Sequence, residues 1–349
     1  MLLRRLSEAI GVSGCEGELR ALILEEIRGR VDECRVDGMG NLIARKNAKG
    51  GSGGDPSLRV MMAAHMDEIG LMITQHEDTG MLRFAKVGGI DDRILPAKPV
   101  LIGQGRLPGV ICFKPVHLME KSERDQVLPA KQLVIDIGAS SKAEAEKLVR
   151  RGDYAVFDVP FEESSGSGSA WRSVQGKAFD DRAGCAILAE LLKESYPFAL
   201  SAAFTVQEEV GLRGARVSAH AEDPAYAVVL ECTGANEVPV KRDVSPSTRL
   251  GGGPAITVMD NSFIADPRLV EHFIGTAKRL GIPHQVKQPN IGGTDAGAIQ
   301  RARLGVPAIT IAVPCRYIHA PSGILNRNDF DHTTILVREA LMRLADAMR

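Results

Sequence analysis

Apolar residues follow two patterns along the chain. Short runs typical of buried strands lie at residues 58–64, 202–206, 225–230 and 308–313. Helices are predicted at about residues 2–10, 16–30, 183–192, 266–280 and 329–348. Strands that alternate with helices favour an α/β fold with a mainly parallel sheet and helices on both faces. In such folds, ligands gather at the carboxyl ends of the strands.

Residues 69–162 have a different character. Short alternating runs are separated there by Gly, Pro and Asp, and little helix is expected outside 141–150. We therefore predict a small β-rich domain at 69–162, inserted into a main domain made of 1–68 and 163–349. A length of 349 residues is enough for two domains with cores of their own.

Composition narrows the classes of function. Apolar residues make up 44%, charged residues 25%, and the formal net charge is −1. This balance favours neither nucleic acid nor an anionic membrane as a partner. No apolar run approaches the roughly 18 residues of a membrane span, and the N-terminus lacks the pattern of a secretory signal. We expect a cytoplasmic protein.

The cysteines make a structural zinc cluster improbable. There are six, none in a Cys-x-x-Cys pair, and most have apolar neighbours. This spacing is typical of reduced thiols in or near a core. Any metal must therefore be held by imidazole and carboxylate groups.

Polar residues with metal-binding groups gather after the predicted core strands and before one helix. In chain order they are His65, Asp67, Asp180, Asp181, Glu208, Glu209, Glu231 and His319. A single pair of polar residues after a strand is commonly only the start of a solvated loop. Several at the same edge of one sheet predict a shared site, because buried carboxylates are costly unless a partner neutralises them.

The donor set indicates the kind of metal. Imidazole and carboxylate without thiolate suit zinc, cobalt or manganese at a hydrolytic site. Two imidazoles with three or more carboxylates exceed what one catalytic zinc needs. The surplus predicts two divalent ions about 3.5–4 Å apart. Ser322, near His319, has no Gly-x-Ser-x-Gly elbow around it, which argues against a serine hydrolase.

Six motifs together resemble the M42 family of metallo-aminopeptidases, the glutamyl and tetrahedral aminopeptidase group among the dinuclear zinc peptidases. They are Ala-Ala-His65-Met-Asp67-Glu-Ile-Gly, Ala-Phe-Asp180-Asp181-Arg-Ala-Gly, Gln-Glu208-Glu209-Val-Gly, Glu231-Cys-Thr233, Gly-Gly293-Thr294-Asp295 and Arg-Tyr-Ile-His319. Each is weak alone, but their order is specific. The resemblance covers essentially the whole chain, including the insertion.

The resemblance implies a role for each metal-binding residue. His65 would bind one ion and His319 the other, with Asp180 bridging the two and joined to Asp181 by a cis peptide bond. Glu209 would complete one ion's ligands and Glu231 the other's. The Glu231 position is commonly Asp in such sites, which leaves the metal preference there open.

Other residues would act around the metals. Asp67 would accept a proton from the His65 imidazole and fix its tautomer. Glu208 would be the general base that takes a proton from metal-activated water and passes it to the leaving amine. The ions would be zinc or cobalt, with manganese also acceptable. Asp181 would also suit a helix cap.

The motifs also point to residues along the substrate. Thr233, Gly293 and Thr294 are the candidate substrate-binding residues, with the glycine loop approaching the peptide backbone closely. The preferred N-terminal side chain cannot be determined from the sequence. Cations that would suit an acidic side chain are Arg213, Lys241, Arg242 and Arg249.

The implied function is removal of N-terminal residues from peptides. The resemblance also implies a homo-oligomer built from dimers through the inserted domain, commonly a tetrahedral dodecamer. Three alternatives stay open: an N-acyl amino acid or other amide hydrolase on the same metals, a glycosidase with two carboxylates and no metal, and a scaffold without activity. The last would be expected to have lost ligands or base, and all are present.

Overall fold

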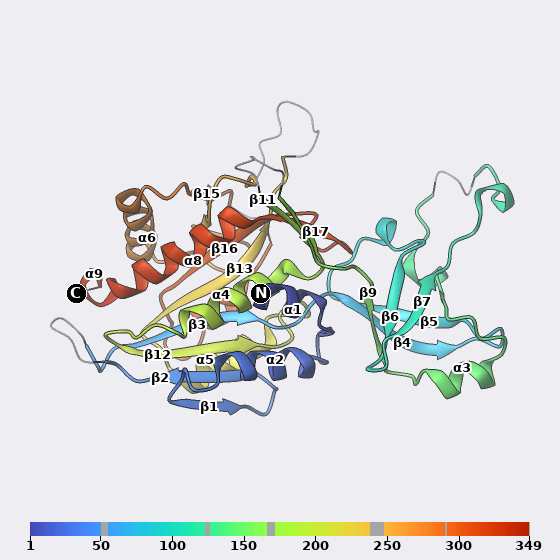
Figure 1. The fold of residues 1–349 in the computed structure, drawn as a ribbon, viewed down its shortest axis with the longest axis horizontal. Helices are drawn as coiled ribbons and strands as arrows, with labels where there is room; N and C mark the ends of the chain where they lie inside the picture. The colour runs from blue at the N-terminus through green and yellow to red at the C-terminus, as the bar shows by residue number, and fades with distance from the viewer. Residues whose placement is uncertain (50–54, 123–125, 166–171, 238–247, 290–291, 349) are drawn as a thin grey trace.

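A computed structural model describes residues 1–49, 55–122, 126–165, 172–237, 248–289 and 292–348. A large sheet with its helices lies at one end of the molecule and a small barrel at the other (Figure 1). None of the described helices is both long and apolar enough to cross a membrane.

Within the described ranges, the large sheet has eleven strands. Along its main path they are β1 (Glu33–Val36), β2 (Leu42–Lys46), β12 (Ala199–Thr205), β3 (Arg59–His65), β13 (Tyr226–Gly234), β16 (Ala308–Arg316), β17 (Gly323–Asn326), β11 (Arg172–Gly176) and β10 (Glu162–Ser165). Strand β14 (Ala255–Thr257) also pairs with β16, and β15 (Gln285–Lys287) pairs with β14. The four predicted core strands become β3, β12, β13 and β16.

The centre of this sheet is parallel, and so is the short pair β14–β15. Strands β12, β3, β13 and β16 run parallel to one another. The hairpin β1–β2 adds antiparallel strands at one edge, and β17, β11 and β10 add them at the other. The expected mainly parallel sheet is therefore a mixed one. Strands β17, β11 and β10 are short and have no long apolar run, so the apolar pattern does not mark them.

Helices pack on both faces of the sheet. Those of the α/β part are α1 (Leu2–Glu8), α2 (Gly17–Ile27), α4 (Phe179–Leu191), α5 (Arg213–Glu222), α6 (Pro267–Leu280), α7 (Asp295–Gln300), α8 (Arg327–Met342) and α9 (Leu344–Ala347). Helices α4 and α8 contact β13 and β16 from one side, with α1 against α4. Helices α5 and α7 pack together on β3, β12 and β13. Helix α5 was not predicted, and the predicted last helix is interrupted at Arg343.

Six antiparallel strands close the barrel. They are β4 (Gly70–His76), β5 (Leu82–Val87), β6 (Pro99–Ile102), β7 (Leu107–Ile111), β8 (Ile135–Asp136) and β9 (Tyr154–Phe157), with helix α3 (Lys142–Leu148) alongside. All lie within the segment predicted to be β-rich. The barrel has its own apolar core, which includes Leu71, Leu82 and Ile135.

Candidate active site

Two histidines meet one aspartate beside the start of α4. His65 ends β3, and its Nε2 lies 3.2 Å from Oδ1 of Asp180. His319 follows β16, and its Nε2 lies 3.2 Å from Oδ2 of the same carboxylate. Asp180 thus faces the two imidazoles through different oxygens. A carboxylate that bridges two cations needs this arrangement.

A glutamate accompanies each histidine. Oε2 of Glu231, on β13, lies 3.6 Å from Nε2 of His65. Oε1 of Glu209, in the loop after β12, lies 3.4 Å from Nε2 of His319. The structure therefore brings the five predicted metal ligands together as two sets, each with one imidazole and one glutamate, that share Asp180.

Asp181 adds a further carboxylate to one set. It is joined to Asp180 by a cis peptide bond, as the resemblance implied. Its Oδ1 accepts a hydrogen bond of 2.8 Å from the N–H of Gly184, so the side chain also caps α4. Donor atoms of Asp181, His65 and Glu231 lie within 4.8 Å of one another. Both roles considered for Asp181 are compatible with this position.

Two buried oxygens of this set lack a hydrogen-bond donor. They are Oδ2 of Asp181 and Oε1 of Glu231, neither of which has a partner in the described part of the chain. Leaving such acceptors unsatisfied is costly. A divalent cation would satisfy both, and imidazole and carboxylate donors suit zinc, cobalt and manganese. The residues present therefore fit a metal site.

The protonation equilibria indicate an excess of negative charge. Burial, followed by the charge of Asp180, raises the pKa of Glu209 to about 7. Burial raises the pKa of Glu231 to about 8. Burial alone would lower the pKa of His319, but Asp180 and Glu209 raise it to about 9. Each shift favours an added positive charge, which a proton or a metal cation supplies.

Asp67 holds the loop that carries both glutamates. Its Oδ1 accepts from the N–H of Glu208 at 3.0 Å, and its Oδ2 accepts from the N–H of Glu209 at 3.1 Å and from the hydroxyl of Ser13 at 2.6 Å. Nδ1 of His65 lies 3.0 Å from the main-chain oxygen of Asp67 and 3.5 Å from its carboxylate. The nearer acceptor for the imidazole is therefore the carbonyl. Ser13 was not found from the sequence.

Glu208 lies in a turn and not on the strand itself. Strand β12 ends at Thr205, and Gln207 has the left-handed backbone (φ 57°) that turns the chain. Burial, followed by the charges of Glu231 and Asp295, raises the pKa of Glu208 well above its usual range, although His65 opposes the shift. A carboxyl group that holds a proton near neutral pH suits proton transfer.

The three expected substrate-binding residues lie in different surroundings. Thr233 is on β13, two residues beyond Glu231, and is buried. Thr294 is buried, and its hydroxyl donates to Oδ2 of Asp260 at 3.1 Å. Gly293, directly before it, is exposed. Of the three, Gly293 offers the most accessible backbone to a ligand.

A buried ion cluster beside the site was not anticipated. Nζ of Lys177 lies 2.8 Å from both carboxylate oxygens of Glu68, and a guanidinium nitrogen of Arg182 lies 3.0 Å from one of them. Lys177 and Arg182 flank the Asp180–Asp181 pair, so the cluster fixes that segment against the residue that follows Asp67. Glu68 and Lys177 are 109 positions apart, and sequence spacing does not reveal such a pair.

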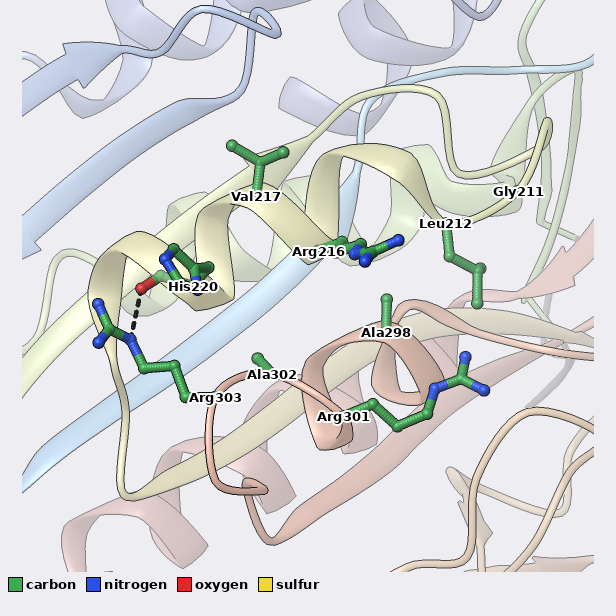
Figure 2. A pocket seen from close by; sticks show the side chains of 9 residues that line it. All are labelled: Gly211, Leu212, Arg216, Val217, His220, Ala298, Arg301, Ala302 and Arg303. Carbon is green, nitrogen blue, oxygen red and sulfur yellow. Dashed lines mark hydrogen bonds between the residues drawn. The ribbon is translucent and has the colours of Figure 1, made fainter.

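A hollow that is separate from the candidate site lies between α5 and α7. Its volume is about 620 Å³, and Arg216, Arg301 and Arg303 line it (Figure 2). Arg303 donates to the main-chain oxygen of His220 at 2.7 Å. None of the predicted catalytic or metal-binding residues lines this hollow.

The family model for M42 glutamyl aminopeptidase matches residues 40–336, which is most of the chain. The chain belongs to this family. The match includes every residue of the two ligand sets, so the expected family resemblance is confirmed. M42 enzymes are metal-dependent aminopeptidases, and the histidines and carboxylates described above could bind a metal.

Individual relatives are similar to this chain along nearly its whole length. The lysyl aminopeptidase of Pyrococcus furiosus is 32% identical over 98% of this chain and 96% of its own. The TET aminopeptidase of a Thaumarchaeota archaeon from marine sediment has a TM-score of 0.90 at 37% identity, covering 98% of this chain and 96% of that one.

Two further similar structures are named for an assembly or for a different activity. The Pyrococcus horikoshii TET1 peptidase, described as assembling into a tetrahedron or a large octahedral shell, has a TM-score of 0.82 at 36% identity and covers 97% of this chain and 98% of that one. A Thermotoga maritima structure named an endoglucanase has a TM-score of 0.81 at 35% identity and covers 100% and 99%.

Proposed function

We propose that this chain removes N-terminal residues from peptides with two divalent metal ions and with Glu208 as the general base. The observation that carries the proposal is the position of Asp180, whose two oxygens face His65 and His319. One ion would be held by His65, Asp180 and Glu231, and the other by His319, Asp180 and Glu209. Bound ions would polarise the scissile carbonyl and make a water proton more acidic.

The residues of the chain perform the remaining tasks. Glu208 accepts a proton from the attacking water and gives it to the nitrogen of the leaving amine, because its carboxyl is buried and its pKa is raised. Asp67 keeps Glu208 and Glu209 in register through their two main-chain N–H groups. The exposed backbone at Gly293 borders the bound peptide.

The test compares substrates with free and blocked amino groups. Initial rates are measured on a panel of aminoacyl-anilides and their N-acetylated forms, with chelated enzyme and after zinc, cobalt or manganese is added. We expect metal to restore cleavage of the free-amine substrates only. Cleavage restricted to the acetylated substrates would contradict the proposal and favour the amide-hydrolase alternative.

The relative named an endoglucanase makes a polysaccharide substrate worth testing. A glycosidase works with two carboxylates and needs no metal. Here the carboxylates lie 3.2–3.6 Å from imidazole nitrogens, which suits shared cation binding better than sugar protonation. We expect no hydrolysis of a soluble cellulose derivative, with or without chelator. Chelator-resistant release of reducing ends would support the glycosidase alternative.

We also propose that the segment 69–162 is a separate domain through which subunits associate. Its support is a set of exposed apolar side chains in this segment, namely Val110, Phe113, Leu118 and Val127. Exposed apolar patches commonly mark contacts between proteins. Relatives that form tetrahedral or octahedral shells agree with a homo-oligomer.

Light scattering tests the assembly. The double variant Val110→Asp/Phe113→Asp should have a lower mass than the wild type. Val36→Asp, an equally exposed valine on β1, is the control and should keep the wild-type mass. An unchanged mass for the double variant would refute the assignment of the contact to the barrel.

A further inference from the structure

Lys287 is a buried lysine whose charge has no close partner among the residues that the structure describes. It ends β15 and is only 6% exposed. Within the part of the chain that the structure describes, its ammonium makes neither a hydrogen bond nor an ion pair within 4 Å. Burying an unpaired ammonium group is strongly unfavourable. Such a residue is retained most readily where a ligand supplies the missing negative charge.

The strand register directs Lys287 to the same face of the sheet as the metal ligands. Lys287 pairs with Thr257, which pairs with Thr310, which pairs with Val229. Paired residues on adjacent strands point to one face, and so do residues two apart on one strand. Glu231 is two residues beyond Val229, so its side chain and that of Lys287 share a face.

The distance across the sheet leaves room for a ligand. Three strand-to-strand steps of about 4.8 Å separate β15 from β13, too far for Lys287 and Glu231 to form a direct pair. Their charges nevertheless interact: burial lowers the pKa of Lys287, while Asp260, Glu231 and Asp180 oppose that shift. Lys287 and Glu231 therefore lie on one face of the sheet, with β14 and β16 between their strands.

Asp260, the carboxylate whose charge affects the pKa of Lys287 most, is already engaged elsewhere. Oδ1 of Asp260 accepts from the N–H and the hydroxyl of Ser262, at 2.6 and 2.7 Å, and Oδ2 accepts from the hydroxyl of Thr294 at 3.1 Å. Asp260 thus shapes the loop before α7. It does not neutralise Lys287 by direct contact.

The ammonium borders the loop expected to follow the substrate backbone. A Cβ added at Gly292 would lie 4.0 Å from Nζ of Lys287. Gly292 has a left-handed backbone (φ 67°), and the next residue is the exposed Gly293. A peptide lying along this loop would bring its N-terminal side chain close to the ammonium.

We propose that Lys287 is the specificity-determining residue of the site and that it binds the side-chain carboxylate of an N-terminal Glu or Asp. This inference rests on the proposed aminopeptidase function. An acidic side chain would pair with the ammonium. A basic side chain would be repelled by it, and an apolar one would leave it unpaired. Members of the family differ in the residue they are named for, lysyl or glutamyl, so membership alone does not choose between these classes.

The cations considered from the sequence are less well placed. Arg213 donates to the side-chain oxygen of Gln207 at 3.2 Å and is exposed. Arg249 is also exposed. Lys241 and Arg242 lie outside the described residues. Lys287 was overlooked because a single lysine in a short strand carries no motif.

The experiment compares kcat/KM on glutamyl-, leucyl- and lysyl-anilides, which have no C-terminal carboxylate, for the metal-loaded enzyme. Lys287→Met removes the charge, Lys287→Arg keeps it, and Lys278→Met changes an exposed lysine on α6 as the control. We expect the wild type to prefer the glutamyl substrate. Lys287→Met should reduce the glutamyl-to-leucyl ratio of kcat/KM by at least about tenfold, mainly through KM, and Lys287→Arg should retain most of it.

The outcomes separate this inference from the proposed function. If the wild type cleaves free-amine substrates but prefers leucyl or lysyl, the role of Lys287 is refuted and the aminopeptidase function stands. An equal loss on all three substrates in Lys287→Met would also refute it, because a structural role predicts that result. If no free-amine substrate is cleaved with any metal, the proposed function itself fails.

Discussion

Two concave regions of the molecule hold their charges in opposite ways. The hollow between α5 and α7 is large, about 620 Å³, and its arginines are exposed to water. The space beside Asp180, Glu209 and His319 is only about 30 Å³, yet burial raises the pKa values of the Glu209 and Glu231 carboxyls at this site. Exposed charges are solvated at little cost, whereas buried ones require a partner. Desolvated charge, more than volume, therefore identifies the chemical site.

Among the variants that test this difference between the two regions, Glu208→Gln should have the largest effect on activity. The amide cannot accept the water proton, so kcat should fall about a thousandfold, while bound metal stays unchanged because every proposed ligand remains. Steady-state kinetics together with metal analysis measures both. Glu190→Gln, an exposed glutamate on α4, is the matched control. A kcat close to the wild-type value in Glu208→Gln would refute the assignment of Glu208 as the general base.

Loss of a ligand should change metal content directly. His65→Ala and His319→Ala should each bind fewer ions than the wild type, because one imidazole of each set is removed. Elemental analysis after dialysis counts the ions per chain. His220→Ala, in the arginine-lined hollow, should bind as many as the wild type. Two ions per chain in both ligand variants would contradict the proposed sets.

Asp67→Asn tests the hydrogen bonds that hold the loop of Glu208 and Glu209. An amide presents one acceptor where the carboxylate accepts from Glu208, Glu209 and Ser13 through two oxygens. We expect kcat to fall by about 10- to 100-fold, the usual cost of losing a residue that orients metal ligands, with the overall fold kept by circular dichroism. An unchanged kcat would mean that the loop holds its shape without this residue.

Metal removal should make stability depend on pH. The folded pKa values of Glu209 (about 7), Glu231 (about 8) and His319 (about 9) are all raised above their unfolded values. Each group therefore stabilises the metal-free protein at low pH and loses that contribution as pH rises through its folded pKa. The melting temperature of chelated protein should fall between about pH 5 and pH 9, and that of metal-loaded protein should fall less. Parallel curves would show that the cluster does not control this dependence.

The smallest effect is expected in the arginine-lined hollow. Arg216→Glu combined with Arg301→Glu reverses two exposed charges that make no ion pair in the described part of the chain. Exposed substitutions commonly change free energies by under about 0.5 kcal/mol, so kcat/KM on the preferred anilide should stay within about twofold. A larger loss would show that this hollow communicates with the site.

The sequence predicted the parts of the fold that long patterns encode. The core strands β3, β12, β13 and β16 were found because their apolar runs are buried on both faces. Short edge strands such as β10 and β17 were not, since four residues carry little periodicity. Helix α5 was missed because its residues are mostly small or charged, with few large apolar side chains to mark a buried face.

The candidate site was predicted unevenly for similar reasons. Residues inside motifs, such as His65 and Asp180, were recognised and are brought together. Partners that meet only through folding were not: Ser13 reaches Asp67 across 54 positions, and Lys177 reaches Glu68 across 109. The turn that holds Glu208 depends on the left-handed backbone at Gln207. Glutamine rarely adopts this conformation, so the residue type does not predict the turn.

The barrel also contacts a proposed metal ligand. Nδ1 of His319 lies 3.1 Å from the main-chain oxygen of Gly89, just after barrel strand β5. Strand β4 begins at Gly70, directly after the segment that contains His65, Asp67 and Glu68. An imidazole proposed to hold metal is therefore oriented by a part of the chain that contributes no ligand. A gene rearrangement that exchanges the insertion would have to preserve this contact, and one that deletes it would lose the contact, so the two parts are expected to evolve as one inherited unit.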